Sequence, residues 1–233
     1  MKVTTNTAYI EQRAKWGRRI APLTMLFLIG GLITNFMSIN NPNLFRPTMI
    51  LLALGFFSAI ISSNLVNNWV REPRADQVLT QVLKKFTNDY VLLNYTSAIP
   101  HVLIAPDGLY AFLVKNNDGE ITVHNRKISR KFSLRRLIGL FGSDALGSPI
   151  GEAESRAGKL QKLLATHLPQ EEIPPIKPVI IFSHRNVQLS TDNPAIPVIH
   201  TNQVKTFLRN EGKNRVISAS QRSQLAELLG AED

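Results

Sequence analysis

Two long apolar runs stand near the start of the chain, separated by a short polar loop. Ile20 to Ile39 and Thr48 to Val66 contain no charged residue. At about 1.5 Å per helical residue, the first run is long enough to cross a hydrocarbon core of about 30 Å. The loop from Asn40 to Pro47 is too short for anything except a tight reversal. The pattern predicts a transmembrane helical hairpin, because a signal peptide would need a small-residue cleavage site and would not be followed by a second span.

After Pro73 the hydrophobic period changes first to that of a helix and then to that of strands. Apolar residues recur at offsets of three and four between Asp76 and Phe86, which predicts one amphipathic helix. Turn signals then separate short β-like runs, and we expect each run to return against the one before it as a meander. The strands expected here are Tyr90 to Tyr95, His101 to Ala105, Leu109 to Lys115 and Glu120 to His124.

The second half of the chain adds helices around one further apolar strand. Leucines at helical spacing predict a helix from Glu152 to His167, and Val179 to Phe182 reads as a buried strand. Pro197 to Ile199 is one more short strand, and Gln203 to Leu208 and Ser220 to Leu229 are helices. Strands with helices on their faces make an α/β domain with a mixed sheet.

These patterns divide the chain into an anchor and one soluble domain. About 160 residues remain after the hairpin, which is the size of one ordinary domain. The predicted parts are an N-terminal segment at 1–19, a first span at 20–39, a loop at 40–47, a second span at 48–66 and a soluble domain at 74–233.

Charge orients the hairpin. The chain carries a net charge of +10, and part of this excess flanks the apolar runs. The first run is preceded by Arg13, Lys15, Arg18 and Arg19, the second is followed by Arg71 and Arg74, and the loop offers only Arg46. Since Lys and Arg collect on the cytoplasmic side, we expect a multi-pass protein of the cell (inner) membrane with both termini and the soluble domain in the cytoplasm.

Small residues line one side of the second run. Gly55, Ser58, Ala59 and Ser62 form overlapping pairs four apart, a spacing that lets helix backbones approach closely. One interpretation is that this side packs on the first span. The other is that it also receives a helix from another membrane subunit.

The centre of the soluble domain resembles a known family. Residues His101 to Asn116 read His-Val-Leu-Ile-Ala-Pro-Asp-Gly-Leu-Tyr-Ala-Phe-Leu-Val-Lys-Asn, with Gly119 beyond them. This stretch resembles the signature of the nuclease-related domain (NERD) family, which runs Asp-His, apolar strand, Gly-Pro-x-Gly, apolar strand, Glu-x-Lys-Asn and Gly. The resemblance extends over most of residues 74–210 and implies a restriction-endonuclease-like fold.

In that family, the resemblance implies, acidic residues and a lysine hold Mg²⁺ and a water for phosphodiester cleavage. Asp76 and Lys115 match the helix acid and the lysine, whereas Pro100 and Leu113 stand at two metal-ligand positions and Glu152 replaces the usual Gln. Neither Pro nor Leu can ligate a metal through its side chain. We therefore expect no catalysis and no metal, with Asp76 equally well explained as an acid near a helix N-terminus.

Six cations within eleven residues form a second candidate site. They are Arg126, Lys127, Arg130, Lys131, Arg135 and Arg136. Such a run is either a solvated surface or a site for the phosphates of anionic lipid or nucleic acid. The five histidines show no paired ligand spacing, and the absence of cysteine removes disulfides and thiolate metal sites.

Taken together, these features favour a membrane-anchored, non-catalytic NERD-like domain that acts as an interaction or scaffold module or an accessory subunit of a membrane complex. No cofactor is expected, and the partners are the bilayer and other membrane subunits. One alternative is a membrane-tethered, Mg²⁺-dependent nuclease with a rearranged site. Another is a module that binds nucleic acid or anionic lipid through the cationic stretch.

Overall fold

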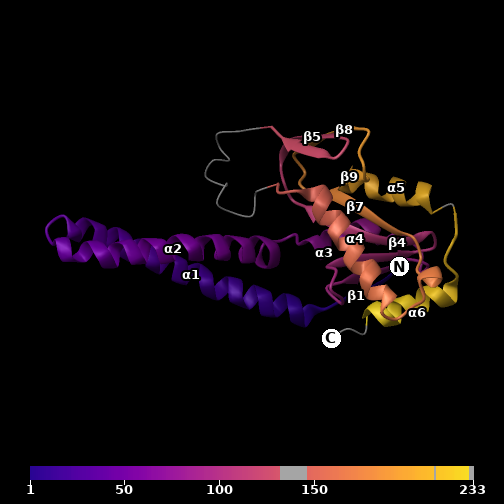
Figure 1. Ribbon diagram of the computed structural model, residues 1–233, viewed down its shortest axis with the longest axis horizontal. Helices are drawn as coiled ribbons and strands as arrows, with labels where there is room; N and C mark the ends of the chain where they lie inside the picture. Colours follow the sequence, from indigo (N-terminus) through magenta and orange to yellow (C-terminus); the bar gives the residue numbers. More distant parts are fainter. Residues whose placement is uncertain (132–145, 213, 231–233) are drawn as a thin grey trace. The chain divides into compact units, whose positions relative to one another are not determined.

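A computed structural model describes residues 1–131, 146–212 and 214–230 (Figure 1). The chain forms two compact units. Met1–Asn6 and the described residues from Ala75 onward make a sheet-containing unit, and Thr7–Arg74 make a helical unit. The expectation of a mixed α/β domain after two long apolar helices is confirmed.

The helical unit is a hairpin of α1 (Thr7–Ser38) and α2 (Phe45–Leu65), which lie side by side in Figure 1. A 3₁₀ turn, η1 (Pro42–Leu44), reverses the chain, and one π-helical turn, η2 (Val66–Val70), continues α2. Both helices are long and apolar enough to cross a membrane. Large apolar side chains on their outer faces are exposed, among them Met25, Phe36 and Phe57 at 65%, 64% and 63%.

Small residues spaced by seven form the seam between α1 and α2. The buried positions include Gly17, Thr24 and Gly31 on α1 and Thr48, Gly55 and Ser62 on α2. A methyl group added at Gly55 would lie 2.6 Å from Leu28 Cδ2, and one at Gly31 would lie 2.7 Å from Leu52 Cδ2. Each leucine therefore fills the space above a glycine of the other helix, which is how small residues let apolar helices approach.

The larger sheet has six strands in the order β1-β2-β3-β4-β7-β9. They span Lys2–Thr5, Val91–Asn94, His101–Ala105, Gly108–Lys115, Ile176–Phe182 and Val198–His200. The central β2, β3 and β4 are antiparallel, as the meander predicts. Strands β1, β7 and β9 each join the sheet in parallel.

A smaller sheet, labelled at β5 and β8 in Figure 1, corrects one prediction. The expected return of Glu120–His124 against Leu109–Lys115 is wrong. β5 (Gly119–His124) pairs with β6 (Lys127–Arg130) and β8 (Val187–Asp192). The reason is that β7 already pairs with β4 at every position from Leu109 to Lys115, so this edge of β4 is occupied by an apolar strand buried on both faces.

Helices cover both faces of the larger sheet. The helices α3 (Ala75–Leu83) and α5 (Val204–Glu211) pack on the face that carries Tyr110 and Phe112. On the other face, α4 (Pro149–Ala165) and α6 (Ala219–Gly230) pack on Val102, Ile104 and Leu109. Two 3₁₀ turns, η4 (Gln170–Glu172) and η5 (Thr201–Gln203), complete the described elements. The helix α3 is shorter than predicted. It ends at Leu83, and Phe86 packs on the core from the turn that follows.

The edge strand β1 was not foreseen from the sequence. Lys2–Thr5 pair in parallel with Val91–Asn94, and the Met1 ammonium donates to Phe86 O and Asn88 Oδ1, both at 2.9 Å. The soluble domain predicted at 74–233 therefore lacks this strand. The first six residues belong to the sheet-containing unit, so the hairpin leaves that unit after Asn6 and returns to it at Ala75.

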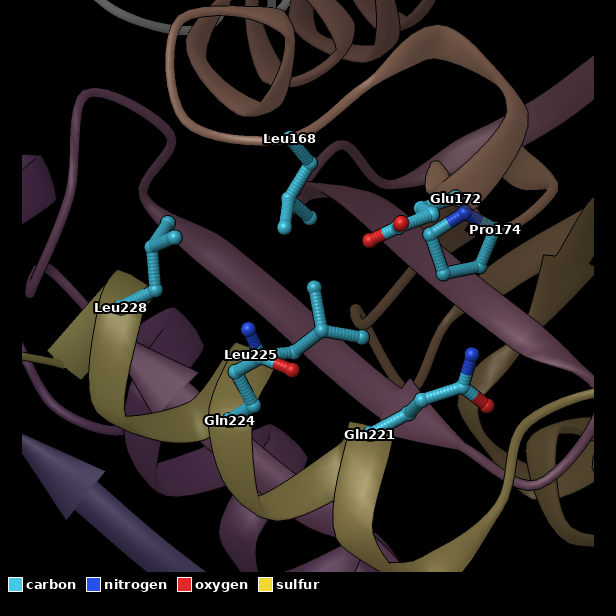
Figure 2. A pocket seen from close by; sticks show the side chains of 7 residues that line it. All are labelled: Leu168, Glu172, Pro174, Gln221, Gln224, Leu225 and Leu228. Atoms are coloured by element: carbon cyan, nitrogen blue, oxygen red, sulfur yellow. The ribbon is translucent and has the colours of Figure 1, made fainter.

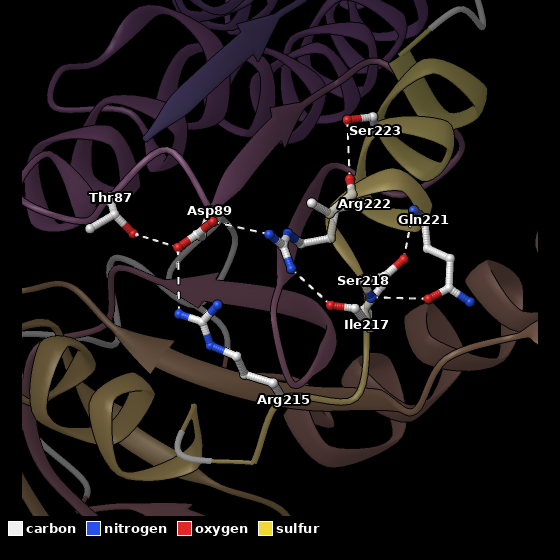
Figure 3. Close-up of polar contacts among 9 residues, drawn as sticks. Thr87, Asp89, Arg215, Ile217, Ser218, Gln221, Arg222 and Ser223 are labelled. Atoms are coloured by element: carbon white, nitrogen blue, oxygen red, sulfur yellow. Dashed lines mark hydrogen bonds and ion pairs between the residues drawn. The ribbon is translucent and has the colours of Figure 1, made fainter.

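An ion-pair network attaches α6 to the turn before β2 (Figure 3). Arg222 is 7% exposed and donates to Ile217 O at 2.8 Å and to Asp89 Oδ1 at 3.0 Å. Arg215 lies 3.7 Å from the other oxygen of Asp89. Because a buried guanidinium is costly unless it is fully paired, Asp89 and the Ile217 carbonyl fix where α6 begins.

Candidate functional site

Lys115 and Glu152, two of the predicted site residues, meet at the end of β4. Lys115 Nζ lies 2.6 Å from Glu152 Oε2, and Arg156, one turn further along α4, lies 3.2 Å from Glu152 Oε1. Arg156 also donates to Phe112 O at 3.0 Å. One carboxylate is thus held between two cations, an arrangement that the sequence did not reveal because Arg156 belongs to no motif.

Burial governs the charge states around this cluster. It lowers the pKa of Arg156 below its ordinary value, while the Glu152 carboxylate opposes that shift. Burial, and then the positive charge of Arg156, lowers the pKa of His101 to about 3. His101 Nδ1 lies 2.9 Å from Asn94 Oδ1, which is the geometry of a neutral imidazole donating to an amide oxygen. His101 is therefore uncharged near neutral pH and is not suited to general acid or base catalysis there.

Of the other positions implied by the resemblance, Leu113 lies two residues before Lys115 on β4, whereas Pro100 and Asp76 lie on other elements. Leu113 is 1% exposed and packs in an apolar cluster with Ile150 and Ala153 of α4. Pro100 lies in the turn between β2 and β3, where its carbonyl accepts the Tyr95 N–H at 2.8 Å. Asp76 is buried in the first turn of α3, a helix that packs on the sheet face opposite α4.

This arrangement is a poor fit to Mg²⁺. That ion prefers several oxygen ligands in near-octahedral order. Here the Glu152 carboxylate is already paired with two cations, and Leu113 offers only hydrocarbon. Among the described residues, no group of three or more His, Asp or Glu side chains is placed to hold a metal ion.

The cationic stretch is largely neutralised where the structure describes it. Arg126 lies 2.7 Å from Glu154, and Lys131 lies 2.8 Å from Glu120. Arg130 pairs with the Asp118 carboxylate and also donates to the Asp118 carbonyl at 2.8 Å. Lys127 is exposed, and Arg135 and Arg136 lie outside the described residues. Three of the six cations in this candidate phosphate site therefore already have carboxylate partners from β5, α4 or the turn before β5.

A second polar cluster, around Asp107, was missed by sequence reasoning. Asp107 is 3% exposed, and it accepts hydrogen bonds from the Tyr110 hydroxyl and from Lys177 Nζ, the latter at 2.9 Å. Lys177 also lies 2.9 Å from Glu211 at the end of α5. Burial and the bond to Asp107 raise the pKa of Tyr110, so its hydroxyl stays protonated. The sequence signal was the Pro106-Asp107-Gly108 turn, but Lys177 and Glu211 come from a strand and a helix that are distant in the sequence.

A shallow pocket lies between α6 and the segment around η4 (Figure 2). Leu168 faces Leu225 and Leu228 across it, and Glu172 and Gln221 supply polar groups beside them. Four of its seven lining residues are apolar, and the other three are Glu172, Gln221 and Gln224.

Comparison with known proteins supplies the family. No curated protein and no solved structure matches the chain. A family model described as the nuclease-related domain, NERD, matches residues 63–183, which is just over half of the chain. The match spans β2 to β7 and includes both Lys115 and Glu152. The resemblance seen around His101 to Asn116 is thus confirmed, and the chain belongs to the NERD family.

Proposed function

We propose that this protein is a membrane-anchored member of the NERD family whose NERD domain is non-catalytic. In this proposal the domain is an interaction or scaffold module, and the protein is an accessory subunit of a membrane complex. The observation that carries the non-catalytic part is the Lys115–Glu152–Arg156 ion pairing, together with Leu113 in an apolar cluster.

The anchor is supported by the helical hairpin. Its apolar outer faces are exposed, which is unfavourable in water and favourable in a bilayer. The hairpin leaves the sheet-containing unit after Asn6 and returns to it at Ala75, which supports the proposal that both its ends lie on the same side of a membrane. The excess of Lys and Arg at those ends favours the cytoplasmic side of the cell membrane.

The non-catalytic part is tested with purified full-length protein. Incubation with Mg²⁺ or Mn²⁺ should leave DNA and RNA intact, because the ligands that would hold the ion are absent or paired. Cleavage that is lost in Lys115→Ala and in Asp76→Ala would instead support a nuclease with a rearranged site. Lys162→Ala, at an exposed position on α4, is the matched control that separates the protein's own activity from a contaminating nuclease.

The accessory-subunit part is tested inside the membrane. A photo-crosslinking residue at Phe57, which is 63% exposed on α2, should give a covalent adduct with one defined membrane protein. The same residue at Leu52, which packs on Gly31, should give crosslinks within the chain. Adducts with lipid alone at several exposed positions would contradict the accessory-subunit role and leave the anchor intact.

A further inference from the structure

The start of α1 and the end of α2 meet at the end of the hairpin away from the η1 turn. We name this region the foot, and it comprises residues 9–19 of α1 and 65–71 at the end of α2 and in η2. A methyl group at Gly17 would lie 3.2 Å from Val70 Cγ2 and 3.3 Å from Leu65 Cβ, so these two side chains pack closely over Gly17. The Tyr9 and Trp69 rings meet edge to face with centroids 5.4 Å apart. The π-helical turn η2 supplies Trp69, and such turns often occur at functional sites.

The foot carries five cations. Arg13, Lys15, Arg18 and Arg19 on α1 and Arg71 after η2 all have exposed side chains. Arg13 Cζ lies 4.9 Å from the Tyr9 ring centroid and 5.8 Å from that of Trp69, so both rings support its guanidinium. Within residues 1–131, 146–212 and 214–230, no carboxylate forms an ion pair with any of these five cations.

The foot lies where the uncharged span begins. Arg18 and Arg19 immediately precede Ile20, the first residue of the apolar run. Trp16 is 55% exposed, and indole rings favour the boundary between hydrocarbon and headgroups. If the hairpin spans a bilayer, Arg18 and Arg19 are therefore at the depth of the lipid phosphates.

We propose that the foot binds the headgroup phosphates of anionic phospholipids through Arg13, Arg18 and Arg19. This inference rests on the proposed membrane anchor. A guanidinium presents paired N–H donors that match phosphate oxygens. The Arg13 guanidinium is positioned by cation–π contacts with two rings, which leave its N–H groups able to donate to phosphate. Lys15 and Arg71 add positive charge that favours an anionic over a zwitterionic lipid.

The chain provides its own reporter for this site. Its only two tryptophans, Trp16 and Trp69, both lie in the foot, so tryptophan emission reports on the foot alone. Full-length protein in mild detergent is titrated with phosphatidylglycerol or with phosphatidylcholine of the same acyl chains. We expect phosphatidylglycerol to change the emission at a lower mole fraction than phosphatidylcholine does.

Arg18→Gln with Arg19→Gln should reduce this preference on the order of twenty-five-fold, since each cation near an anionic surface accounts for about a five-fold factor. Lys159→Gln with Lys162→Gln removes the same charge from exposed positions on α4 and should leave the preference unchanged. Equal losses in the two double variants would overturn the assignment to the foot, because net charge alone would then explain the preference.

A second arm separates this inference from the anchor on which it rests. Phosphatidylcholine vesicles brominated near the glycerol end of the acyl chains should quench both tryptophans if the foot lies at the interface. Absence of quenching would contradict the membrane anchor itself. Quenching combined with equal affinity for the two lipids would overturn only the anionic-lipid site.

A third arm tests the other sources of phosphate. Inorganic phosphate and a single-stranded DNA oligonucleotide, each at about 150 mM salt, should leave the emission unchanged, because exposed charges are screened beyond about 8 Å. A change by either probe equal to that caused by phosphatidylglycerol would overturn the lipid assignment. Equality with the oligonucleotide would identify a nucleic-acid site at the foot instead.

Discussion

Two basic regions of this molecule look alike in sequence and differ in structure. The stretch from Arg126 to Lys131 is rich in cations, yet Arg126, Arg130 and Lys131 each have a carboxylate partner. At the foot, Arg13, Lys15, Arg18 and Arg19 form no such pair within the described residues. The density of positive charge along a chain therefore does not tell which cations remain available to phosphate. What decides is whether the fold brings acidic residues from other elements beside them.

The largest expected effect is on the pH dependence of unfolding. It concerns His101, which is buried in the sheet-containing unit and is affected by the charge of Arg156. Its pKa is about 3 when folded and about 6.5 when unfolded, so the unfolded chain takes up the proton first. The contribution of neutral His101 to the unfolding free energy is fully present above pH 6.5 and is lost as the pH falls toward 3. Between pH 7 and pH 5 the loss attributable to His101 is about 2 kcal/mol.

His101→Gln should remove this part of the pH dependence. Denaturant unfolding of the sheet-containing unit in the full chain, followed by amide hydrogen exchange on β3 and β4, measures it at both pH values. An unchanged pH slope in the variant would show that His101 is not the group responsible.

The next effect concerns Glu152. Glu152→Gln leaves Lys115 and Arg156 facing each other without the carboxylate between them. Because Glu152 is 40% exposed, water offsets part of the loss, and we expect about 1–1.5 kcal/mol of destabilisation at pH 7. Hydrogen exchange on β4 and α4 is the measurement. Glu171→Gln, at an exposed position, is the control and should change the unfolding free energy by less than about 0.5 kcal/mol.

A smaller effect on stability is expected when the carboxylates that pair with the cations of the Arg126–Lys131 stretch are removed. Glu120→Gln with Glu154→Gln removes one carboxylate from Lys131 and one from Arg126. Exposed pairs contribute little, so the unfolding free energy should fall by less than about 1 kcal/mol for each pair. Binding to anionic vesicles or to an oligonucleotide should nevertheless increase and become steeply dependent on salt. Unchanged binding would show that pairing is not what limits this stretch.

The smallest effect on stability is expected at the foot, where the cations have no carboxylate partner within the described residues. Arg18→Gln with Arg19→Gln should change the unfolding free energy in detergent by no more than about 0.5 kcal/mol, because these side chains have no ion-pair partner within the described residues. Circular dichroism during thermal unfolding measures this. A large loss of helicity would mean that the two arginines hold the hairpin together rather than face the lipid.

The sequence predicted what depends on neighbours in the chain. The two apolar spans, the antiparallel strands around Pro106-Asp107-Gly108 and the helix carrying Glu152 all follow from period and turn residues. It did not predict β1 or β8, which are short, mainly exposed strands whose partners are distant in sequence. For the same reason it placed β5 against β4, since nothing local announces that β7 occupies that edge.

The candidate site shows the same limit. The family resemblance identified Lys115 and Glu152, but not that they bind each other across 37 residues of chain or that Arg156 completes the group. In the Asp107 cluster, Lys177 binds Asp107 from 70 residues further along the chain and Glu211 from 34 residues before it. Long-range charge pairing depends on the register of strands and helices, which one-dimensional patterns do not contain.

The strand β1 makes the helical hairpin an insertion within the sheet-containing unit rather than an extension of it. Because Lys2–Thr5 pair with Val91–Asn94, a strand that precedes both apolar helices can join the sheet only after those helices have been made. A single protease cut in the connection at residues 71–74 would therefore not release the sheet-containing unit from the hairpin. The hydrogen bonds of β1 and those of the Met1 ammonium would still join the two parts.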